Sequence, residues 1–391
     1  MEYAAWLLLL GFTLITWQAV SVRLQPHILA WAFAGIVVYW GGRRTLGAPT
    51  AVLLVLAVAY YTYWLYWHPN HAYTNDIEGH TAYINYLRQD ILGAYSYREA
   101  EFWHPPTYYA IAAGWLNLTQ DWLGWQDNTL LRLLALSFYI VFCIFSLKTL
   151  RLYNPKDTLV YFMGCLLILF WPAAILTATR ITNDVLLYTG WSAFFYYFAR
   201  WAFHNRDMDL VIALMLAGLS LMIKLPAAVL LGIAGLYLAG QLLSGQAPWR
   251  LLLRPWMLVA YMVVLGGVFV NLGRSLATYF YTGRWVSYLG NKGYVELKAS
   301  KFLSFDLLAF LRDPYIGYSQ IKFQPDHFTY FAKSALYGEF RWGNPAIASM
   351  LNMMFVLFLG LTVVGIAVGL YNKNLRMKNI APLLLTLVLS Y

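Results

Sequence analysis

The sequence predicts an all-α, polytopic membrane protein with about 11 transmembrane helices. Hydrophobic residues make up 61% of its 391 residues and charged residues only 11%, less than half of the roughly 25% that is usual in soluble proteins. The mean hydropathy of +0.56 points the same way. The apolar residues also fall into separate runs, and a helix needs roughly 17–25 of them to cross a bilayer.

Eleven apolar runs account for the predicted spans, and several end in Trp or Tyr, which favour the head-group level of a bilayer. In chain order the runs are Trp6–Val20, His27–Trp40, Ala51–Trp67, Leu130–Leu147, Leu159–Leu176, Val185–Ala199, Leu210–Ile223, Ala227–Leu243, Trp256–Asn271, Ala346–Tyr371 and Ile380–Tyr391. A further run, Pro105–Leu118, has only 14 residues and opens with two prolines. We expect it to form an interfacial helix rather than a span.

The basic residues between the runs set the predicted orientation. With Pro105–Leu118 outside the membrane and a cytoplasmic N-terminus, 12 basic residues fall in inner gaps and 3 in short outer gaps. An excess on the cytoplasmic side is typical of multi-pass proteins of the cell membrane. The inner residues are Arg43, Arg44, Lys148, Arg151, Lys156, Arg200, Arg206, Arg250, Arg254, Lys373, Arg376 and Lys378. The outer residues are Arg23, Arg180 and Lys224.

Two long hydrophilic stretches, 68–129 and 272–345, fall on the extracytoplasmic side in this topology. Long loops in compact proteins are usually functional, so we expect a site there, with interfacial helices in both loops. The chain has no strand–helix alternation and no Gly-rich phosphate loop, which argues against a nucleotide-binding domain. Residues 1–391 therefore read as one transmembrane domain.

The net charge of +10, from 27 basic and 17 acidic residues, does not indicate nucleic-acid binding. The basic residues lie between apolar runs, where they contact anionic lipid head groups, and no nucleic-acid-binding motif accompanies them. Cys143 and Cys165 both lie inside apolar runs, which is not the pattern of a secreted disulfide scaffold.

The first outer loop brings acids close to histidines. If a helix begins at Asp76, then Asp76 and His80 are four residues apart and share one face, whereas Glu78 points elsewhere. A carboxylate beside an imidazole suits general-base chemistry. The same residues could instead cap a helix in a solvated loop. Further along, His104 precedes two prolines that fix a rigid turn.

Two further outer segments carry isolated charges. Asp184 lies at the outer end of a predicted span, four residues after Arg180, and Lys224 lies at the tip of a helical hairpin. An ionisable residue at such a depth is a functional candidate, although Arg180 and Asp184 could also form a structural ion pair. Lys224 could bind an anionic group such as a lipid phosphate, or extend its amine to the interface.

Together these segments resemble the GT-C superfamily of polyprenyl-phosphate-sugar glycosyltransferases, in particular its protein O-mannosyltransferase and lipid A aminoarabinose transferase branch. The resemblance covers roughly residues 50–345 in order and sidedness. The matching motifs are Asp76-Ile77-Glu78-Gly79-His80, His104-Pro105-Pro106, Arg180-Ile181-Thr182-Asn183-Asp184, Met222-Ile223-Lys224 and Ala335-Leu336-Tyr337-Gly338-Glu339-Phe340. Many relatives have adjacent Asp and Glu residues, whereas Ile77 follows Asp76 here.

The resemblance implies an inverting glycosyl transfer on the extracytoplasmic face. Asp76 would accept the proton of the acceptor, and Asp184 would be the second catalytic carboxylate. Glu78, His80 and His104 would bind the acceptor or the sugar. The partners implied are a polyprenyl-phosphate-linked sugar donor, a glycan, lipid or protein acceptor, and membrane lipids, with no nucleic acid.

The leaving polyprenyl phosphate needs cationic partners, for which the resemblance suggests Arg180, Lys224 and Arg274. A divalent cation such as Mg²⁺ or Mn²⁺ is compatible with this chemistry but is not required by it. The oxygen ligands available to such an ion would be Asp76, Glu78 and Asp184.

Two other functions remain open on the sequence. A transporter or flippase for a lipid-linked or charged substrate would need ionisable residues near the membrane midplane, whereas this chain has its candidates at the outer rim. A lipid-linked glycan polymerase or ligase of a different fold could use Arg312, Lys322 and His327 in the second loop, but it would leave Asp76 and Asp184 unused.

Overall fold

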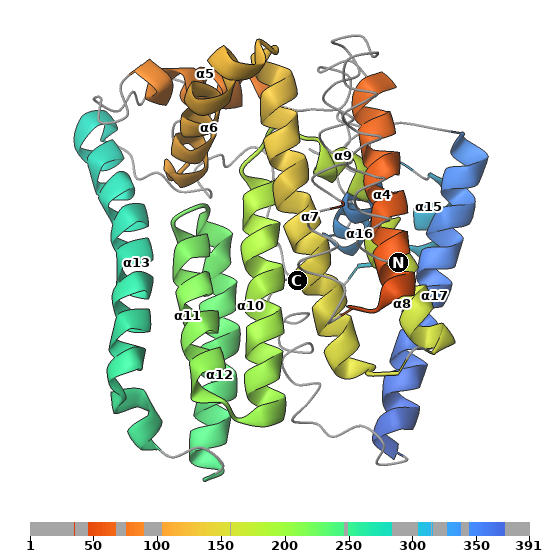
Figure 1. Cartoon of the computed structure of the whole chain (residues 1–391). Coiled ribbons are helices and arrows are strands. Elements are labelled where there is room, and N and C mark those ends of the chain that lie inside the picture. The colour runs from red at the N-terminus through yellow and green to blue at the C-terminus, as the bar shows by residue number, and fades with distance from the viewer. Residues whose placement is uncertain are drawn as a thin grey trace, which may run out of the picture. The chain divides into compact units, whose positions relative to one another are not determined.

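The described part of the chain is helical and contains no strand (Figure 1). The computed structural model describes residues 35, 46–67, 76–89, 104–156, 158–245, 249–283, 304–313, 315, 327–337 and 344–371. Its elements are α4 (Ala48–Trp67), α5 (Ile77–Gln89), α6 (Thr107–Leu123), α7 (Asp127–Tyr153), α8 (Leu159–Leu169), α9 (Ala174–Ala178), α10 (Asp184–His204), α11 (Asp207–Leu221), η2 (Leu225–Ala227), α12 (Ala228–Leu243), η3 (Trp249–Leu253), α13 (Pro255–Thr282), α15 (Leu307–Arg312), α16 (His327–Tyr337) and α17 (Pro345–Tyr371).

Four described helices are long and apolar enough to cross a membrane. They are Asp127–Tyr153, Leu225–Leu243, Pro255–Ala277 and Pro345–Val368. Two shorter apolar helices, Pro49–Thr62 and Leu159–Leu169, accompany them. The predicted spans Trp6–Val20, His27–Trp40 and Ile380–Tyr391 lie outside the described residues, apart from Gly35. The total of about 11 spans therefore stays a prediction.

The run Leu159–Leu176, predicted as one span, is divided between two helices. Helix α8 ends at Leu169, and α9 starts only at Ala174. Pro172 lies between them. Proline lacks a backbone N–H and clashes with the preceding helical turn, so this position interrupts the helix despite its apolar surroundings. Hydropathy alone did not separate a long helix from two short ones here.

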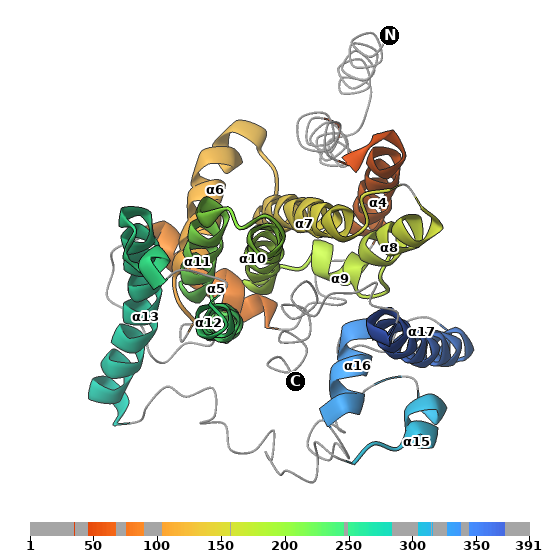
Figure 2. The same cartoon turned by 90° about the horizontal axis from the view of Figure 1, so that it is seen from below.

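The stretch 68–129, predicted as an outer loop with an interfacial helix, contains α5, α6 and the first residues of α7. Helix α6 follows Pro105 and Pro106 and ends at Leu123. Gly124 caps it with a left-handed φ of 63°, and its N–H donates to the Gln120 carbonyl. Helix α6 is absent from the four candidate spans among the described helices. It packs against α5 and α7 (Figures 1 and 2).

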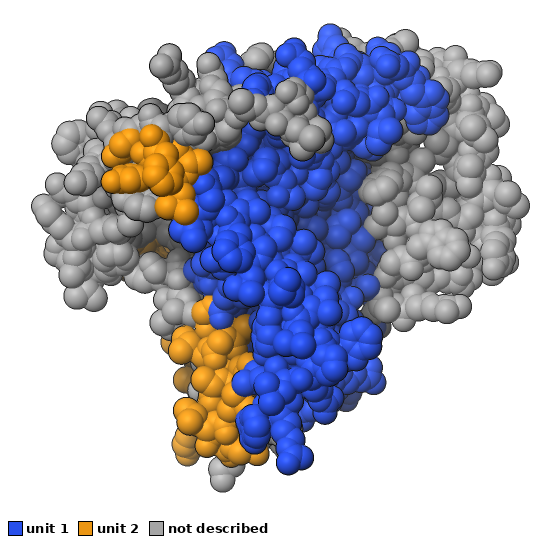
Figure 3. Space-filling view, turned by 90° about the vertical axis from the view of Figure 1, so that its left-hand side faces the viewer, with its two compact units in different colours: residues 1–231, 249–274 blue, residues 232–248, 275–391 orange. Residues whose placement is uncertain are grey.

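The chain divides into two compact units (Figure 3). Unit 1 comprises residues 1–231 and 249–274, and unit 2 comprises residues 232–248 and 275–391. In unit 2, α15 packs against α17, where the Asn352 amide donates to the Phe310 carbonyl at 3.4 Å. The stretch 272–345, predicted as the second outer loop, starts within α13 and contains α15 and α16.

In unit 1, α10 packs between α7 and α11 (Figures 1 and 2). Helices α11 and α13 approach very closely, because a Cβ on Gly218 would lie 2.8–2.9 Å from backbone atoms of Val263 and Val264. Small residues allow such approaches between membrane helices. The Asn271 amide donates to the Leu221 carbonyl at 2.7 Å. These contacts fix the segment of α13 that leads to Arg274 against the end of α11.

Candidate functional site

The centre of the candidate site is an ion pair between two segments that are 40 residues apart. The Lys224 Nζ donates to the Asp184 Oδ1 at 2.5 Å. Asp184 is the first residue of α10, and Lys224 lies between α11 and η2. The Asp184 side chain is 29% exposed and the Lys224 side chain 16%. The pair is therefore largely shielded from water but remains accessible to a ligand. The predicted site residues Asp184 and Lys224 are therefore in direct contact.

Local structure holds the Asp184 carboxylate in place. The Thr182 hydroxyl donates to the Asp184 Oδ2 at 3.3 Å, and the N-terminus of α10 favours a negative charge at its first turn. The turn before α10 is held from α7, where the buried Arg132 side chain donates to the Thr179 carbonyl at 3.2 Å. Lys224 follows a turn in which its own N–H donates to the Ser220 carbonyl at 3.0 Å.

Neighbouring basic side chains determine the charge state of Asp184. Burial by itself would raise the pKa of this carboxyl, but the electrostatic effects of Lys224, Arg180 and, least, His104 outweigh it and hold the pKa below the usual range. Asp184 is therefore ionised at neutral pH. An ionised carboxylate held by cations suits a group that orients its neighbours better than a group that exchanges protons.

The predicted residues His80 and His104 lie beside each other although 24 residues separate them in the sequence. Both are buried, and their rings are stacked with centroids 6.3 Å apart. The His80 Nδ1 and the Tyr109 hydroxyl are hydrogen-bonded at 2.9 Å, with the donor set by the imidazole tautomer. Pro105 and Pro106 lead the chain from His104 directly into α6, so that Tyr109 lies in the first turn of this helix.

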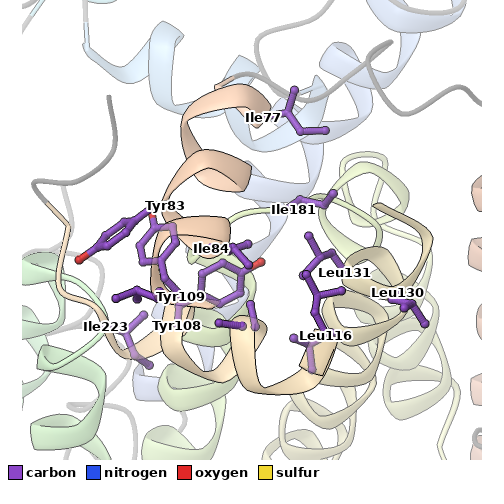
Figure 4. Close-up of a cluster of buried hydrophobic side chains, with 14 of the residues drawn as sticks. Ile77, Tyr83, Ile84, Tyr108, Tyr109, Leu116, Leu130, Leu131, Ile181 and Ile223 are labelled. Atoms are coloured by element: carbon purple, nitrogen blue, oxygen red, sulfur yellow. The ribbon is translucent and has the colours of Figure 1, made fainter. Parts of the chain in front are cut away.

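An aromatic stack connects the histidines to Arg274. The rings of Tyr109 and Tyr83 are stacked at 4.2 Å, and both belong to the buried cluster beneath α5 and α6 (Figure 4). The Arg274 Nη1 donates to the Tyr83 hydroxyl at 3.1 Å, and its guanidinium carbon lies 5.9 Å from the centre of that ring. The predicted residue Arg274, on α13, is thus joined to the histidines of α5 and the α6 entrance.

Thr107 connects α6 to the hairpin that carries Lys224. Its hydroxyl donates to the Met222 carbonyl at 2.6 Å, two residues before Lys224. Ile223 is buried in the same apolar cluster as Tyr108 and Tyr109 (Figure 4). The interfacial segment predicted at Pro105–Leu118 therefore packs directly against the Lys224 turn.

Asp76 and Glu78 lie apart from these contacts and are exposed, Asp76 directly before α5 and Glu78 in its first turn. The expected shared face of Asp76 and His80 is not observed, because α5 begins at Ile77, and Asp76 is exposed whereas His80 is buried. Asp76 has a φ of 56°, a left-handed conformation that Asp and Asn tolerate better than most residues. Its carbonyl accepts from the His80 N–H at 3.0 Å.

The described residues contain no group of three His, Cys, Asp or Glu side chains arranged to hold a metal ion. The suggested oxygen ligands Asp76, Glu78 and Asp184 do not form such a group. Asp184 is paired with Lys224, whereas Asp76 and Glu78 are exposed at the start of α5. Their suggested role as ligands for Mg²⁺ or Mn²⁺ stays a prediction.

The structure adds Tyr83, Tyr109, Thr107 and Asn183 to the site. The sequence assigned none of them a role, although Asn183 lies within the motif that ends at Asp184. Tyr109 belongs to a Tyr108-Tyr109 pair that follows Thr107 after the two prolines, and no sequence pattern marked it or Tyr83. Asn183 is fully buried next to Asp184, and its amide atoms have no hydrogen-bond partner among the described residues. A buried unpaired amide is costly, so this position is a further candidate for contact with a bound polar group.

Comparison of the chain with protein-family models, with curated proteins and with solved structures gives no match.

Proposed function

We propose that the protein is a membrane glycosyltransferase of the GT-C type, which transfers a sugar from a polyprenyl-phosphate carrier to an acceptor on the extracytoplasmic face. The observation that supports this most is the gathering of five separately expected residues in unit 1. His80, His104, Asp184, Lys224 and Arg274 come from different segments, yet ion-pair, ring and hydrogen-bond contacts connect their surroundings.

The basic side chains of the site would bind the phosphate of the donor. In the transfer, the bond between the anomeric carbon and the phosphate oxygen breaks, and polyprenyl phosphate leaves as an anion. Lys224, Arg180 and Arg274 supply positive charge near the ends of apolar helices, where a lipid phosphate would lie. The ion pair with Asp184 positions the Lys224 amine. The same amine could also donate a hydrogen bond to a phosphate oxygen of the donor.

Residues at α5 and at the entrance to α6 would contact the acceptor. An acceptor hydroxyl or amine attacks the anomeric carbon from the face opposite to the phosphate and loses its proton to a base, so the configuration inverts. Asp76 is the proposed base, and its exposed position directly before α5 leaves it open to an incoming acceptor. Glu78, His80 and His104 are the proposed contacts to the sugar or acceptor.

We place the protein in the cell membrane with about eleven spans and the site on the extracytoplasmic side. The apolar runs and the excess of inner basic residues support this arrangement. The four long apolar helices are compatible with it.

The transfer can be tested with the purified protein in lipid nanodiscs and a panel of polyprenyl-phosphate sugars. Release of polyprenyl phosphate should occur with the wild type, and Asp76→Asn should reduce the rate by about 10²–10⁴-fold, as expected for loss of a general base. Asp121→Asn, which neutralises an exposed carboxylate on α6, is the matched control and should retain the rate. Translocation of an intact lipid-linked sugar without its cleavage would instead identify a transporter and overturn the proposal.

A further inference from the structure

A second cluster of charged and aromatic side chains lies at the end of unit 1 away from the Asp184–Lys224 pair. Helices α7 and α10 run in the same direction, and their C-terminal turns lie at the same end (Figure 1). Lys148 lies near that end of α7 and Arg200 near that end of α10. At 1.5 Å per residue, Arg200 is about 24 Å along the helix from Asp184.

Lys148 and Arg200 meet over the same aromatic ring. The Lys148 Nζ lies 5.8 Å and the Arg200 Cζ 5.4 Å from the ring centre of Tyr196. Lys148 also lies 5.5 Å from the ring of Phe145, and Arg200 lies 5.5 Å from the ring of Tyr197. These three rings are partly exposed. Two like charges are thus held together on a surface that only partly hydrates them.

One carboxylate balances only part of this charge. The Arg200 Nη2 lies 3.2 Å from the Oδ1 of Asp209, which is buried at the start of α11. Lys148 forms no ion pair within the part of the chain that the structure describes. The cluster therefore holds two cations against one acid, and the positive excess lies on the partly exposed ring face.

We propose that Lys148, Arg200 and the Tyr196 ring bind the phosphate of an anionic phospholipid in the leaflet opposite to the Asp184–Lys224 pair. The proposed topology has α10 cross the bilayer along the predicted run Val185–Ala199. The separation of about 24 Å along α10 then approaches the roughly 30 Å thickness of the hydrocarbon core, which brings the two cations near the phosphate level of that leaflet. Both can donate charge-assisted hydrogen bonds to one phosphodiester, and the rings strengthen the binding by excluding water. This site is independent of the proposed transfer reaction.

The alternative is a diffuse attraction between all basic residues at this end and a negative membrane surface. Arg206 tests it, because it is exposed between α10 and α11 at the same end and carries the same charge. A diffuse field weakens equally when either Lys148 or Arg206 is neutralised. A defined site weakens only with Lys148.

The experiment measures the thermal unfolding midpoint of the full chain in phosphatidylcholine nanodiscs with increasing phosphatidylglycerol. The wild type should be stabilised with saturation, and Lys148→Gln should shift the half-saturating fraction upward about fivefold, the effect expected for one interfacial cation. Arg206→Gln should behave as the wild type, and Lys148→Arg should restore binding if the glutamine variant folds poorly. Equal shifts for Lys148→Gln and Arg206→Gln, or no stabilisation by phosphatidylglycerol, would overturn the proposal.

A second arm separates a lipid head group from free phosphate. Inorganic phosphate added to pure phosphatidylcholine nanodiscs should give no Lys148-dependent stabilisation, because the site is completed by the membrane surface. Stabilisation by inorganic phosphate equal to that by phosphatidylglycerol would contradict a lipid ligand.

Discussion

The Lys224 Nζ lies 2.5 Å from the Asp184 Oδ1, and this contact joins the start of α10 to the turn after α11. Around it, Arg180 and His104 help to lower the pKa of the Asp184 carboxyl, and the Thr107 hydroxyl connects the start of α6 to the same turn by a hydrogen bond. The pair thus has two roles. It holds two helix ends together, and it positions an ammonium group at the end of the helices.

The structural role predicts energetic coupling between the two side chains. Asp184→Asn and Lys224→Gln should each lower the free energy of unfolding, and the double variant should lose less than the sum of the two. The coupling energy should lie at about 0.5–3 kcal/mol, the range for residues in direct contact. Denaturant or thermal unfolding of the four proteins in detergent measures it, and strictly additive losses would show that the pair contributes nothing.

The charge state of Asp184 predicts a pH dependence. Lys224 and its neighbours hold the pKa of this carboxyl down against the effect of burial, so Lys224→Gln should let the pKa rise. At neutral pH the variant should show its full loss of stability relative to the wild type. This loss should shrink as the pH falls through the pKa that Asp184 has in the variant, because a protonated Asp184 gains nothing from a nearby cation. Melting curves from about pH 4 to pH 8 test this, and the double variant with Asp184→Asn should show no such trend.

Asp76 is the proposed proton acceptor, and its backbone has an unusual conformation. At a φ of 56°, Asn is tolerated about as well as Asp, so Asp76→Asn should melt within about 0.5 kcal/mol of the wild type while losing transfer. Asp76→Gly should be equally or more stable, since glycine adopts this conformation freely, and should also be inactive. Transfer at the wild-type rate by either variant would remove Asp76 from the mechanism.

The close approach of α11 and α13 predicts a stability difference between two glycines. Gly218→Ala would press a Cβ against backbone atoms of Val263 and Val264, which should cost about 1–3 kcal/mol. Gly114→Ala places its Cβ in open space on α6 and should be neutral or stabilising by up to about 1 kcal/mol. Thermal unfolding compares them, and equal stability of the two variants would contradict the close helix contact.

The sequence predicted the helical class and the positions of most described helices because long apolar runs and their polar ends are local signals. The break at Pro172 was missed because the run around it is uniformly apolar, although the proline itself was visible. Asp184 and Lys224 were singled out as isolated charges, but their pairing depends on the packing of α10 against α11. The stack of Tyr83 on Tyr109 likewise joins two helices, and no local pattern distinguished these tyrosines from the other 29 in the chain.

The start of α5 shows that a shift of one residue in a helix boundary changes a site prediction. A helix from Asp76 would have put its carboxylate on the face of His80, but the helix begins one residue later and Asp76 turns into the left-handed region. The sequence had no means of placing that boundary to within one residue. The transfer rate of Asp76→Asn therefore tests the base assignment directly.

Binding of polyprenyl phosphate tests the central claim most directly, because this product is common to every sugar donor of the proposed class. Native mass spectrometry or a thermal shift on the nanodisc-embedded protein should detect saturable binding. Lys224→Gln should weaken it about tenfold or more, as for a lost charge-assisted contact, and Lys148→Gln should leave it unchanged. No binding by the folded wild type, or equal binding by Lys224→Gln, would contradict a lipid-phosphate site at the Asp184–Lys224 pair.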